Sequence, residues 1–582
     1  MESIILDRPW QFDRADDALV MDVAQKAGIP KVIARLLCQR GIDSLNDVER
    51  HLCPGLGSLS DPWEMADMEK AVERLVRAVE RREPVAVFGD YDADGITATA
   101  LMSQFLTGLG LDVAIHIPHR VHEGYGLNIE NIKRFNSMGI GLVITVDCGI
   151  SNHQEIAFAA GLGMDVIVTD HHEPPRQMPQ AMAVLNPKRP DCGFAFKEIA
   201  GVGVAFNLVR ALRSRLYRLG HWANGDIPNL KTCLDLVAIG TIADMVPLIK
   251  DNRIMVKTGL EVIRSGARMG IRALMETNGV LYEDVTSKDI SFRIAPRINA
   301  AGRIAHAEEA FKLLVTDDHG FAIRQAEKLS AINQERRTEE AAILKEAQGL
   351  IKNLGQRPGY VLYSQNWHKG IIGIVASKLV EQILRPVILL TIEDGKAHGS
   401  GRSPEGLNLH AVLSECADQL VAFGGHKSAA GVHLLTERLE PFIKKFEDTV
   451  SARLKDLDLT PRLKLDCPVP LEELTTPVFQ RFFELLEPFG FGYPVPVFAV
   501  NNFTIHSSKV VGNSHLKLTL TSKNSSGPKT SNGSKMEVLA WGQADKAALE
   551  WEGLELACTP CLTVWQHQKR LELRLQDARH AA

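Results

Sequence analysis

The sequence has no long apolar run. A transmembrane helix needs about 20 consecutive apolar residues, and no such stretch occurs among the 582 residues, so we expect no membrane span. The first residues, MESIILDRPWQFDRADD, carry acidic side chains early and contain no long apolar segment, which argues against a secretory signal. We therefore expect a cytoplasmic protein.

Cysteine is scarce and forms no disulfide framework. The nine cysteines are scattered along the chain, as is usual for reduced thiols in a cytosolic protein. Cys558 and Cys561 form a lone CxxC pair with no second pair, so we interpret them as ordinary thiols rather than as zinc ligands. The thiols therefore indicate neither a metal site nor a covalent crosslink.

The chain also lacks a strong excess of charge. Its net charge is -5, and 24% charged with 45% hydrophobic residues describes an ordinary globular protein. Composition alone does not indicate DNA binding, so any such surface must be a local patch. A chain of this length is too long for one core, and we expect about three or four domains.

Three common catalytic motifs are absent. The sequence contains no GxxxxGK[ST] loop, no GxSxG elbow and no HExxH pair. The run Gly201-Val-Gly-Val-Ala has no clear strand before it, so it predicts a tight turn into a helix rather than a dinucleotide-binding loop. The chemistry must therefore come from another set of residues.

An apolar run that ends in alternating carboxylates is the most informative stretch. Residues 85–89 predict a buried strand, and Asp90, Asp92 and Asp94 follow it before Gly95. Residues i, i+2 and i+4 of a strand share a face, so these carboxylates can converge on a hard divalent cation. The alternative is an acidic turn that only caps the next helix, but a cap needs a single carboxylate.

Short apolar runs alternate with amphipathic helices from residue 84 onward. This pattern predicts α/β architecture with a mainly parallel sheet and right-handed crossovers. In such sheets the chemistry gathers beyond the carboxyl ends of the strands. The runs at 85–89, 142–146 and 166–169 lead into the acidic turn, Asp147, and Asp170-His171-His172, and the run at 113–118 leads into Arg120.

A further acid, Asp244, ends a helical segment that Pro247 stops. Oxygen and nitrogen ligands without a thiolate favour Mn²⁺ or Mg²⁺, and this many acids favour two ions, which suits phosphoester hydrolysis. We interpret His172 as a group that orients a ligand or faces substrate, with a plain structural role as the alternative. The candidate ligands are Asp90, Asp92, Asp94, Asp147, His171 and Asp244.

Three polar segments further along the chain are candidates for phosphate binding. Residues 297–303 predict a compact loop that holds Arg297, Asn299 and Arg303, with a basic surface turn as the alternative. Residues 399–403 and 423–431 are rich in glycine and include Ser400, Arg402 and His426. Small residues let backbone amides approach an anion closely, and the alternative is a loop that packs on the core.

A long helix and a small barrel complete the predicted architecture. Residues 322–353 contain no proline or glycine before Gly349 and are polar on all sides near 333–340, which predicts a helix of about 45 Å that bridges two domains with a hydrated middle. The last part predicts a five-stranded β barrel with a long hairpin loop at 522–534. From residue 501 onward there are ten Lys and Arg residues and seven Asp and Glu residues, and this modest excess of positive charge suits binding of single-stranded nucleic acid.

These segments resemble the DHH phosphoesterase superfamily, named for the triplet at 170–172, and specifically the bacterial RecJ single-strand exonucleases. The resemblance covers nearly the whole chain through ordered motifs at 90–95, 146–149, 169–172, 243–244, 297–303, 400–403 and 424–431. It implies two α/β domains joined by the long helix, namely a parallel-sheet DHH domain and a DHH-associated domain, plus a C-terminal OB-fold barrel. The implied boundaries are an N-terminal helical segment at 1–80, then 81–320, 321–355, 356–455 and 456–582.

The resemblance also implies roles for individual residues. Asp90, Asp92, Asp147, His171 and Asp244 would hold the metals, with Asp147 bridging them. Related phosphatases have a metal-binding histidine where this chain has Ala86, so Asp94 either replaces that ligand or only faces substrate. Ser400, Arg402 and His426 would grip the terminal phosphate and backbone, and Arg120 would contact another phosphate.

The function implied is that of a single-stranded-DNA-specific 5′ to 3′ exonuclease. It would release 5′-mononucleotides by two-metal phosphodiester hydrolysis with Mn²⁺ or Mg²⁺, in DNA repair and recombination. We expect a monomer that works with a single-stranded-DNA-binding protein and a helicase. The alternatives are a DHH hydrolase of short oligonucleotides or cyclic dinucleotides, and an inactive single-strand-binding scaffold, which would have no reason to keep so many carboxylates.

Overall fold

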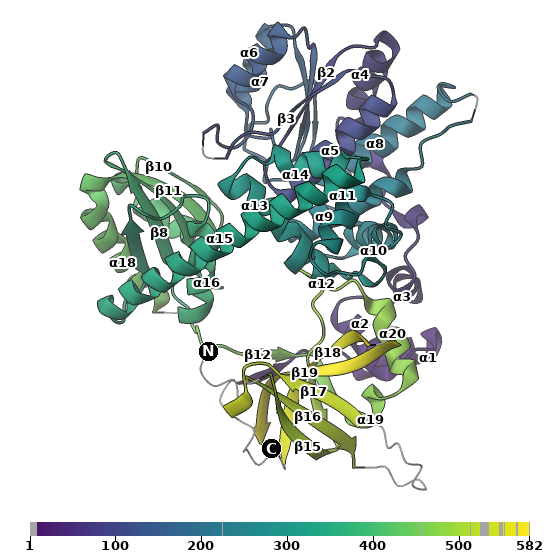
Figure 1. Cartoon of the computed structure of the whole chain (residues 1–582), viewed down its shortest axis with the longest axis vertical. Coiled ribbons are helices and arrows are strands. Elements are labelled where there is room, and N and C mark those ends of the chain that lie inside the picture. The colour runs from purple at the N-terminus through teal and green to yellow at the C-terminus, as the bar shows by residue number, and fades with distance from the viewer. Residues whose placement is uncertain are drawn as a thin grey trace.

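The computed structural model describes residues 9–120, 122–223, 225–455, 457–512, 514–523, 535–545, 551, 553–565 and 568–580. These residues form two α/β domains, a long helix between them, and a C-terminal β domain (Figure 1). Most of the predicted hairpin loop at 522–534 lies outside this range. No helix in the described part of the chain is long and apolar enough to cross a membrane.

The first domain is built on a five-stranded parallel sheet, as predicted. Its strand order is β3-β2-β4-β5-β6, and every neighbouring pair is parallel. The short strand β6 was not predicted because three residues are too few to show a pattern. The strands are β2 Val85–Gly89, β3 Val113–His116, β4 Leu142–Val146, β5 Asp165–Thr169 and β6 Ala183–Leu185.

Helices cover both faces of this sheet, which explains the nearly continuous apolar runs of its strands. Val85, Val87 and Ile144 belong to the same core as the helices of one face, and the alternate residues Ala86 and Phe88 pack with α6 and α7 on the other. The first face carries α4 Met68–Arg81, α5 Ala93–Gly108 and α8 Gly201–Arg218, and the second carries α6 Ile129–Ser137 and α7 His153–Gly161.

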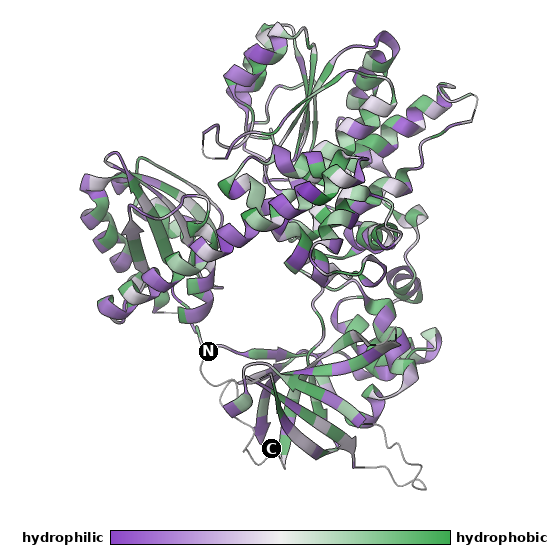
Figure 2. Ribbon diagram, in the orientation of Figure 1, coloured by the Kyte–Doolittle hydropathy of each residue, from purple (hydrophilic) through white to green (hydrophobic). Residues whose placement is uncertain are grey.

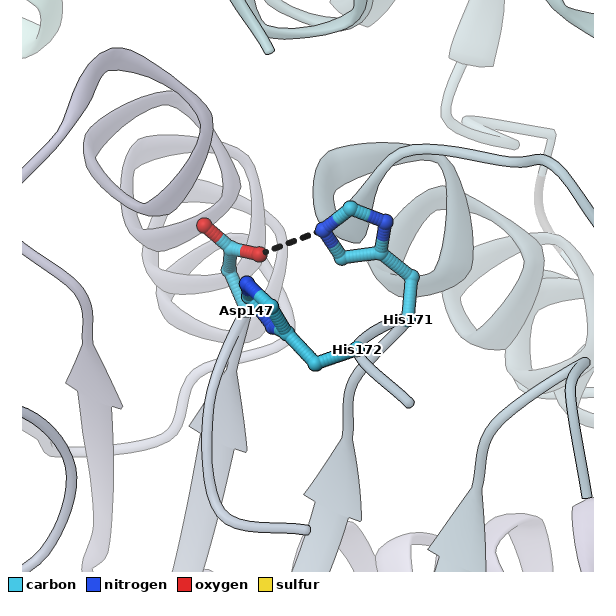
Figure 3. Close-up of side chains that lie close together, drawn as sticks. All are labelled: Asp147, His171 and His172. Carbon is cyan, nitrogen blue, oxygen red and sulfur yellow. Dashed lines mark ion pairs between the residues drawn. The ribbon is translucent and has the colours of Figure 1, made fainter. Parts of the chain in front are cut away.

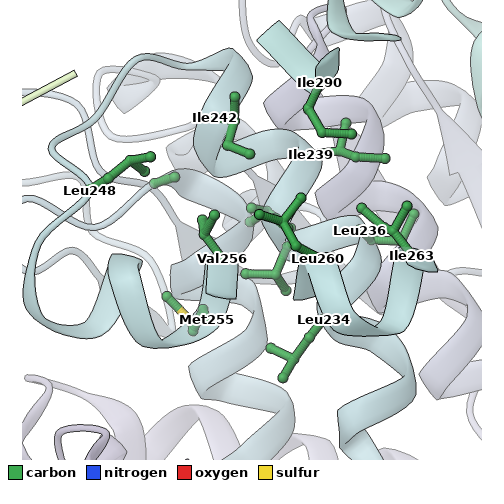
Figure 4. Close-up of a cluster of buried hydrophobic side chains, with 14 of the residues drawn as sticks. Leu234, Leu236, Ile239, Ile242, Leu248, Met255, Val256, Leu260, Ile263 and Ile290 are labelled. Carbon is green, nitrogen blue, oxygen red and sulfur yellow. The ribbon is translucent and has the colours of Figure 1, made fainter. Parts of the chain in front are cut away.

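A helical layer extends the first domain towards the C-terminal domain. Its centre is α9, which is buried on every side and packs on α10 through Leu236, Ile239 and Leu260 (Figure 4). The layer consists of α9 Leu234–Ala243, α10 Lys250–Arg264, α11 Met269–Glu276, α12 Ser287–Asp289, the π-helical turn η5 Ile290–Ile294, α13 Ala295–Ile304 and α14 Glu308–Val315.

The prediction of a compact loop at 297–303 is wrong, because these residues lie in helix α13. Pro296 stands in the first turn of this helix, where a missing N–H does no harm. Gly302 suggested a loop, but it serves close packing, since a Cβ there would lie 2.1 Å from the Tyr91 carbonyl oxygen. The motif is therefore a helix pressed against the acidic turn.

The predicted bridging helix is α15, His319–Leu354. Its first half packs on α11 and α13 and its second half on α16 of the second domain, and its polar middle is visible in Figure 2. The expectation of a middle hydrated on all sides is wrong for two residues. Asn333 and Glu340 are buried, and the Glu340 carboxylate is paired with Arg336 and Lys378.

The second domain contains a mixed sheet in the order β10-β11-β9-β8-β7, in which only β7 and β8 are parallel. The candidate phosphate segments fall on β9 and on the turn between β10 and β11. The elements are β7 Tyr360–Ser364, α16 Ile372–Ile383, β8 Val387–Glu393, β9 Lys396–Arg402, α17 Leu409–Glu415, β10 Ala422–Gly425, β11 Ala429–Leu435 and α18 Leu439–Leu454.

The described part of the C-terminal domain has a seven-stranded sheet rather than the five strands predicted. Its order is β13-β14-β18-β19-β17-β16-β15. One extra strand, β13, precedes the short helices α19 Leu471–Leu474 and α20 Pro477–Leu486 and joins β14 in parallel. A second arises because Asn502 takes a left-handed conformation with φ of 57° and divides one apolar run in two. The strands are β13 Cys467–Pro470, β14 Phe498–Asn501, β15 Phe503–Val511, β16 His515–Ser522, β17 Lys535–Ala540, β18 Leu554–Trp565 and β19 Gln568–His580.

The N-terminal segment packs on the C-terminal domain, so chain segments far apart in sequence lie side by side (Figure 1). It contains the predicted helices, but also a strand, β1 Trp10–Phe12, that pairs in parallel with β12 Leu463–Leu465. Arg253 of α10 ties the first domain to the same region, because its buried guanidinium donates to the carbonyl groups of His51, Leu485, Leu486, Glu487 and Pro488. The helices are α1 Asp17–Ala27, α2 Lys31–Gln39 and α3 Leu45–Leu52.

Candidate metal centre

The acidic turn lies between the end of β2 and the start of α5. Asp92 is the N-cap of α5, and its Oδ1 accepts hydrogen bonds from the N–H groups of Asp94 and Gly95 at 3.0 and 3.1 Å. The capping role therefore applies to one of the three carboxylates. Gly95 lets the chain fold back, because a Cβ there would lie 2.6 Å from the Asp90 backbone.

Asp94 is buried and held by another helix. Its carboxylate accepts hydrogen bonds from the N–H groups of Gly201 and Val202, at 2.7 and 2.8 Å, where α8 begins. Helix N-termini favour anions, which explains why the chain can bury this acid. Burial, followed by the charge of Asp92, nevertheless raises the pKa of Asp94 to about 7.

Asp90 and Asp147 each present a buried oxygen without a hydrogen-bond partner. The atoms are Asp90 Oδ1 and Asp147 Oδ1. Burial raises the pKa of both groups well above the usual range, with Asp92 the next cause for Asp90 and Asp94 the next cause for Asp147. Asp147 follows β4 in a left-handed conformation with φ of 62°, a strained geometry that is common at functional sites.

His171 follows β5 and faces Asp147 (Figure 3). Its Nε2 lies 3.2 Å from Asp147 Oδ1, 3.5 Å from Asp244 Oδ2 and 3.9 Å from Asp94 Oδ2. Burial, and then the positive charge of His172, lowers the pKa of His171 to about 3, and the ring also hydrogen-bonds the backbone of Ile199. The His171 ring is therefore neutral, and its Nε2 makes no hydrogen bond. The lone pair of this nitrogen faces the lone pairs of the carboxylate oxygens.

His172 is in a different state from its neighbour. Its Nδ1 lies 2.8 Å from Asp170 Oδ1 and 3.1 Å from the Tyr125 hydroxyl. Burial opposes the charged ring, but the hydrogen bond to Asp170 and the charges of Asp170 and Asp244 outweigh it and raise the pKa of His172 to about 9. The imidazolium side chain is 41% exposed, so it can face a substrate at the edge of the acid cluster.

The donor atoms of this cluster fit divalent cations. Three sets of ligand atoms each lie within 4.8 Å of one another: Asp90, Asp92 and Asp147; Asp94, His171 and Asp244; and Asp147, His171 and His172. Buried polar atoms without partners are costly, and three such atoms converge here. Carboxylate oxygens and one imidazole nitrogen suit Mn²⁺ or Mg²⁺. Asp94 thus lies within the cluster, beside His171 and Asp244.

The predicted phosphate residues of the first domain lie around the acidic turn. The Arg120 guanidinium stacks over the Tyr91 ring, 4.1 Å from its centre, and Arg303 donates to the Gly370 carbonyl of the second domain at 3.0 Å. Asn299 accepts a hydrogen bond from the Ala93 N–H at 2.8 Å, so it helps to hold the acidic turn in place. Arg297 lies earlier on α13 and donates to Ser330 of α15.

The predicted residues of the second domain form two groups. Arg402 donates to the hydroxyls of Ser377 and Ser400, at 3.1 and 2.9 Å, and burial lowers the pKa of its guanidinium. His426 is exposed in the turn after β10. It lines a separate cavity of about 470 Å³ together with Glu173, which directly follows His172. The two domains therefore face each other at the edge of the acid cluster.

Two residues of this centre were not predicted as site residues. Asp170 is fully buried and accepts hydrogen bonds from the N–H groups of Ile150, His171 and His172 as well as from the His172 ring. Its place in the triplet was a signal, but its orienting role depends on the fold. Tyr125, which contacts His172 and the Asp147 carbonyl, had no sequence signal.

Comparisons with known proteins agree with this geometry. The model of the DHH family, N-terminal domain, matches residues 84–241, that of the DHHA1 domain residues 357–452, and that of the RecJ OB domain residues 465–577. The chain is 34% identical to the single-stranded-DNA-specific exonuclease RecJ of Bacillus subtilis, over 98% of this chain and 70% of that protein. The corresponding Escherichia coli protein is 38% identical over 84% of this chain and 87% of its own length.

The chain belongs to the RecJ family. The predicted family and the predicted fold, with its DHH, DHH-associated and OB domains, are therefore confirmed. Among solved structures, RecJ of Thermus thermophilus in complex with Mn²⁺ is similar to this chain with a TM-score of 0.82 at 32% identity, covering all of this chain and 80% of that one. The same protein with Mg²⁺ gives a TM-score of 0.74 at 30% identity, covering 99% and 79%. One of these RecJ structures thus contains Mn²⁺ and the other Mg²⁺, the two kinds of metal that the ligand chemistry favours.

Proposed function

We propose that the chain is a metal-dependent exonuclease that degrades single-stranded DNA from its 5′ end and releases 5′-mononucleotides. The observation that carries this proposal is the convergence of Asp90 Oδ1, Asp147 Oδ1 and His171 Nε2, three buried donor atoms without hydrogen-bond partners, at the carboxyl edge of a parallel sheet. Membership in the RecJ family supports it, because the curated relatives are single-stranded-DNA-specific exonucleases.

In this proposal the acid cluster holds two Mn²⁺ or Mg²⁺ ions. The residues that would hold them are Asp90, Asp92, Asp94, Asp147, His171 and Asp244, and Asp147 is the one carboxylate among them that belongs to two of the three ligand sets. When bound, such ions supply Lewis-acid activation of water and of the phosphoryl group. The hydrogen bond between His171 and the Ile199 backbone would hold the ring with its Nε2 available to a bound ion.

The protein side chains orient the phosphodiester and balance its charge. The His172 imidazolium, held by Asp170, can donate its second ring N–H to a phosphoryl oxygen or to the leaving oxygen. Arg120 lies close enough to Asp90 to affect the pKa of that carboxyl group, and its guanidinium suits a neighbouring phosphate. The His172 imidazolium and the Arg120 guanidinium are both in place before substrate arrives, which limits reorganisation during the reaction.

The second domain selects the strand end. Arg402 and Ser400 lie on β9, and Gly373 of α16 brings the helix backbone against them, because a Cβ there would lie 2.9 Å from Ser400 Oγ. A guanidinium, a hydroxyl and a helix start suit a terminal phosphate. His426, in the cavity beside Glu173, would contact the backbone of the strand.

Digestion of end-labelled DNA tests this function. A long single strand labelled at its 5′ or its 3′ end is incubated with Mn²⁺ or Mg²⁺, and the products are resolved by size. We expect 5′ label to appear at once as a mononucleotide, whereas 3′ label shortens gradually. A dinucleotide and a blunt duplex should be poor substrates. Rapid release of 3′ label, or a preference for dinucleotides, would contradict the proposal and favour a short-oligonucleotide hydrolase.

Arg402→Ala is expected to weaken recognition of the 5′ end. Loss of a charge-assisted bond to a terminal phosphate should raise KM about tenfold for a 5′-phosphorylated strand and much less for a 5′-hydroxyl strand. Arg402→Lys serves as the matched variant, since it keeps the charge without the planar fork and should lie in between. An unchanged ratio of kcat/KM between the two strands would refute the role of Arg402.

The remaining assignments belong to the same proposal. Hydrolysis is assigned to residues 81–320, end recognition to 356–455 and strand binding to 456–582, with 321–355 as the connecting helix and 1–80 as an N-terminal helical segment. The enzyme acts as a monomer in the cytoplasm, in DNA repair and recombination. A helicase that exposes single strands and a single-stranded-DNA-binding protein are its proposed partners.

A further inference from the structure

Phe292 is an exposed aromatic residue in an unusual helical turn. It lies in the π-helical turn Ile290–Ile294, whose two end residues are buried, whereas Phe292 itself is 74% exposed. π-helical turns are rare and occur frequently at functional sites. A single exposed phenylalanine proves nothing alone, so its surroundings decide its role.

Three arginines, Arg293, Arg297 and Arg337, lie close together next to Phe292. Arg297 of α13 donates to the carbonyl of Arg293, and its pKa is lowered by burial and then by the charges of Arg337 and Arg293. Within the described part of the chain, no acid is paired with Arg297 or Arg337, and Arg293 has only a loose contact with Asp289 at 3.7 Å. Neighbouring guanidiniums, two of them without an acidic partner in the described part of the chain, suit the phosphates of a nucleic acid.

A cavity of about 640 Å³ separates Phe292 from the C-terminal domain. Its far wall includes Leu562 and Thr563 of β18 and Arg574 of β19. The cavity is lined by equal numbers of acidic and basic side chains together with Leu281 and Phe292, so it suits a flat neutral group better than a phosphate. A nucleobase has that chemistry, and aromatic rings bind bases by stacking.

Helix α13 connects this place to the acid cluster. Asn299 contacts the acidic turn through the Ala93 N–H, and Phe292 lies seven positions earlier in the same continuous helical segment. At about 1.5 Å per residue the two are roughly 10 Å apart along the helix axis. A strand whose phosphate lies at the acid cluster and that continues to the C-terminal domain therefore passes Phe292 within a few nucleotides.

We propose that Phe292 is a specificity-determining residue, which stacks on one base of the strand on the 3′ side of the bond that is cleaved. This inference rests on the proposed exonuclease function and deepens it. The phosphates of the same nucleotides would lie on Arg293, Arg297 and Arg337. Hydrolysis then depends on a base at one fixed distance from the cleaved bond, which favours long strands over dinucleotides.

Abasic scanning of the substrate tests the proposal directly. A set of single strands carries one abasic site at successive positions from the 5′ end, and single-turnover rates are measured at subsaturating enzyme. The single-turnover rate of the wild-type enzyme should fall for one position of the abasic site, the register at which the base that stacks on Phe292 is missing. Phe292→Ala should lose this register and raise KM for an intact strand about tenfold with kcat retained, whereas Phe292→Trp should preserve the register.

Two further variants serve as controls. Phe292→Leu keeps apolar volume without a ring and should behave like Phe292→Ala. Tyr217→Ala removes an aromatic side chain that is 60% exposed on α8 and should match the wild type. Melting temperatures confirm that each variant is folded. An unchanged abasic profile and KM for Phe292→Ala would overturn the proposal, whereas failure of the wild type to degrade single strands would instead refute the proposed function.

Discussion

Asp147→Asn is expected to abolish hydrolysis while single-strand binding stays measurable. Asparagine keeps the shape of the side chain but removes the charge at the one carboxylate that belongs to two of the three ligand sets. Loss of a metal bridge removes several kcal/mol of transition-state stabilisation, which corresponds to a fall in kcat of about a thousandfold or more. Release of mononucleotides from a labelled strand measures kcat, and fluorescence anisotropy without metal measures binding.

The same variant has a second expected signature. In the metal-free protein the Asp147 carboxylate is buried among acids that raise its pKa, so the neutral amide should raise the melting temperature. The control is Asp112→Asn, at an exposed position before β3 at the opposite edge of the sheet, which should change neither activity nor melting. Wild-type turnover by Asp147→Asn would refute the two-metal assignment.

Removal of divalent cations is expected to destabilise the protein increasingly as the pH rises. The pKa values of Asp94 and Asp244 are raised to about 7 and about 9, mainly by burial. Acids with raised pKa values bind protons in the folded state that the unfolded chain has already released, so the metal-free fold loses stability as pH rises through this range. Bound cations offset the repulsion and should raise the melting temperature by about 5 °C or more.

Melting of metal-free and Mn²⁺-loaded protein between pH 7 and pH 9 measures this effect. The difference between the two curves is the informative quantity, because other titrating groups such as Lys257 contribute to both. The difference should increase with pH in the wild type and be smaller in Asp244→Asn. The assignment of these acids would be contradicted if the increase in melting temperature on adding Mn²⁺ were independent of pH, or if it were the same in Asp244→Asn as in the wild type.

The sequence was sufficient to predict four of the five strands of the first domain and the gathering of acidic side chains at their carboxyl ends. Strands β2, β4 and β5 are almost wholly buried apolar runs, and each candidate ligand follows the end of a strand or helix, so the local pattern was informative there. It was insufficient where tertiary contacts decide. Gly302 indicates a loop by local preference, yet it is helical because α13 must approach the Tyr91 carbonyl closely.

Other features depend on partners far away in the chain. Strand β1 is too short to predict, and its pairing with β12 joins segments separated by most of the sequence. The burial of Asp94 depends on α8, whose first N–H groups donate to its carboxylate from more than 100 residues further along the chain. The orienting role of Asp170 likewise required the backbone of a neighbouring loop. Local patterns therefore predicted which side chains gather at the acid cluster. They did not predict the distant contacts that position those side chains.

We expect the buried guanidinium of Arg253 to affect the heat tolerance of the protein without affecting the acid cluster. Carbonyl groups of two chain segments depend on this single cation, and none of them belongs to the acid cluster. Variation at this position would alter the temperature at which the C-terminal domain separates from the rest, while the catalytic residues keep their arrangement. Adaptation to a warmer or colder habitat could therefore proceed here without a change in substrate or mechanism.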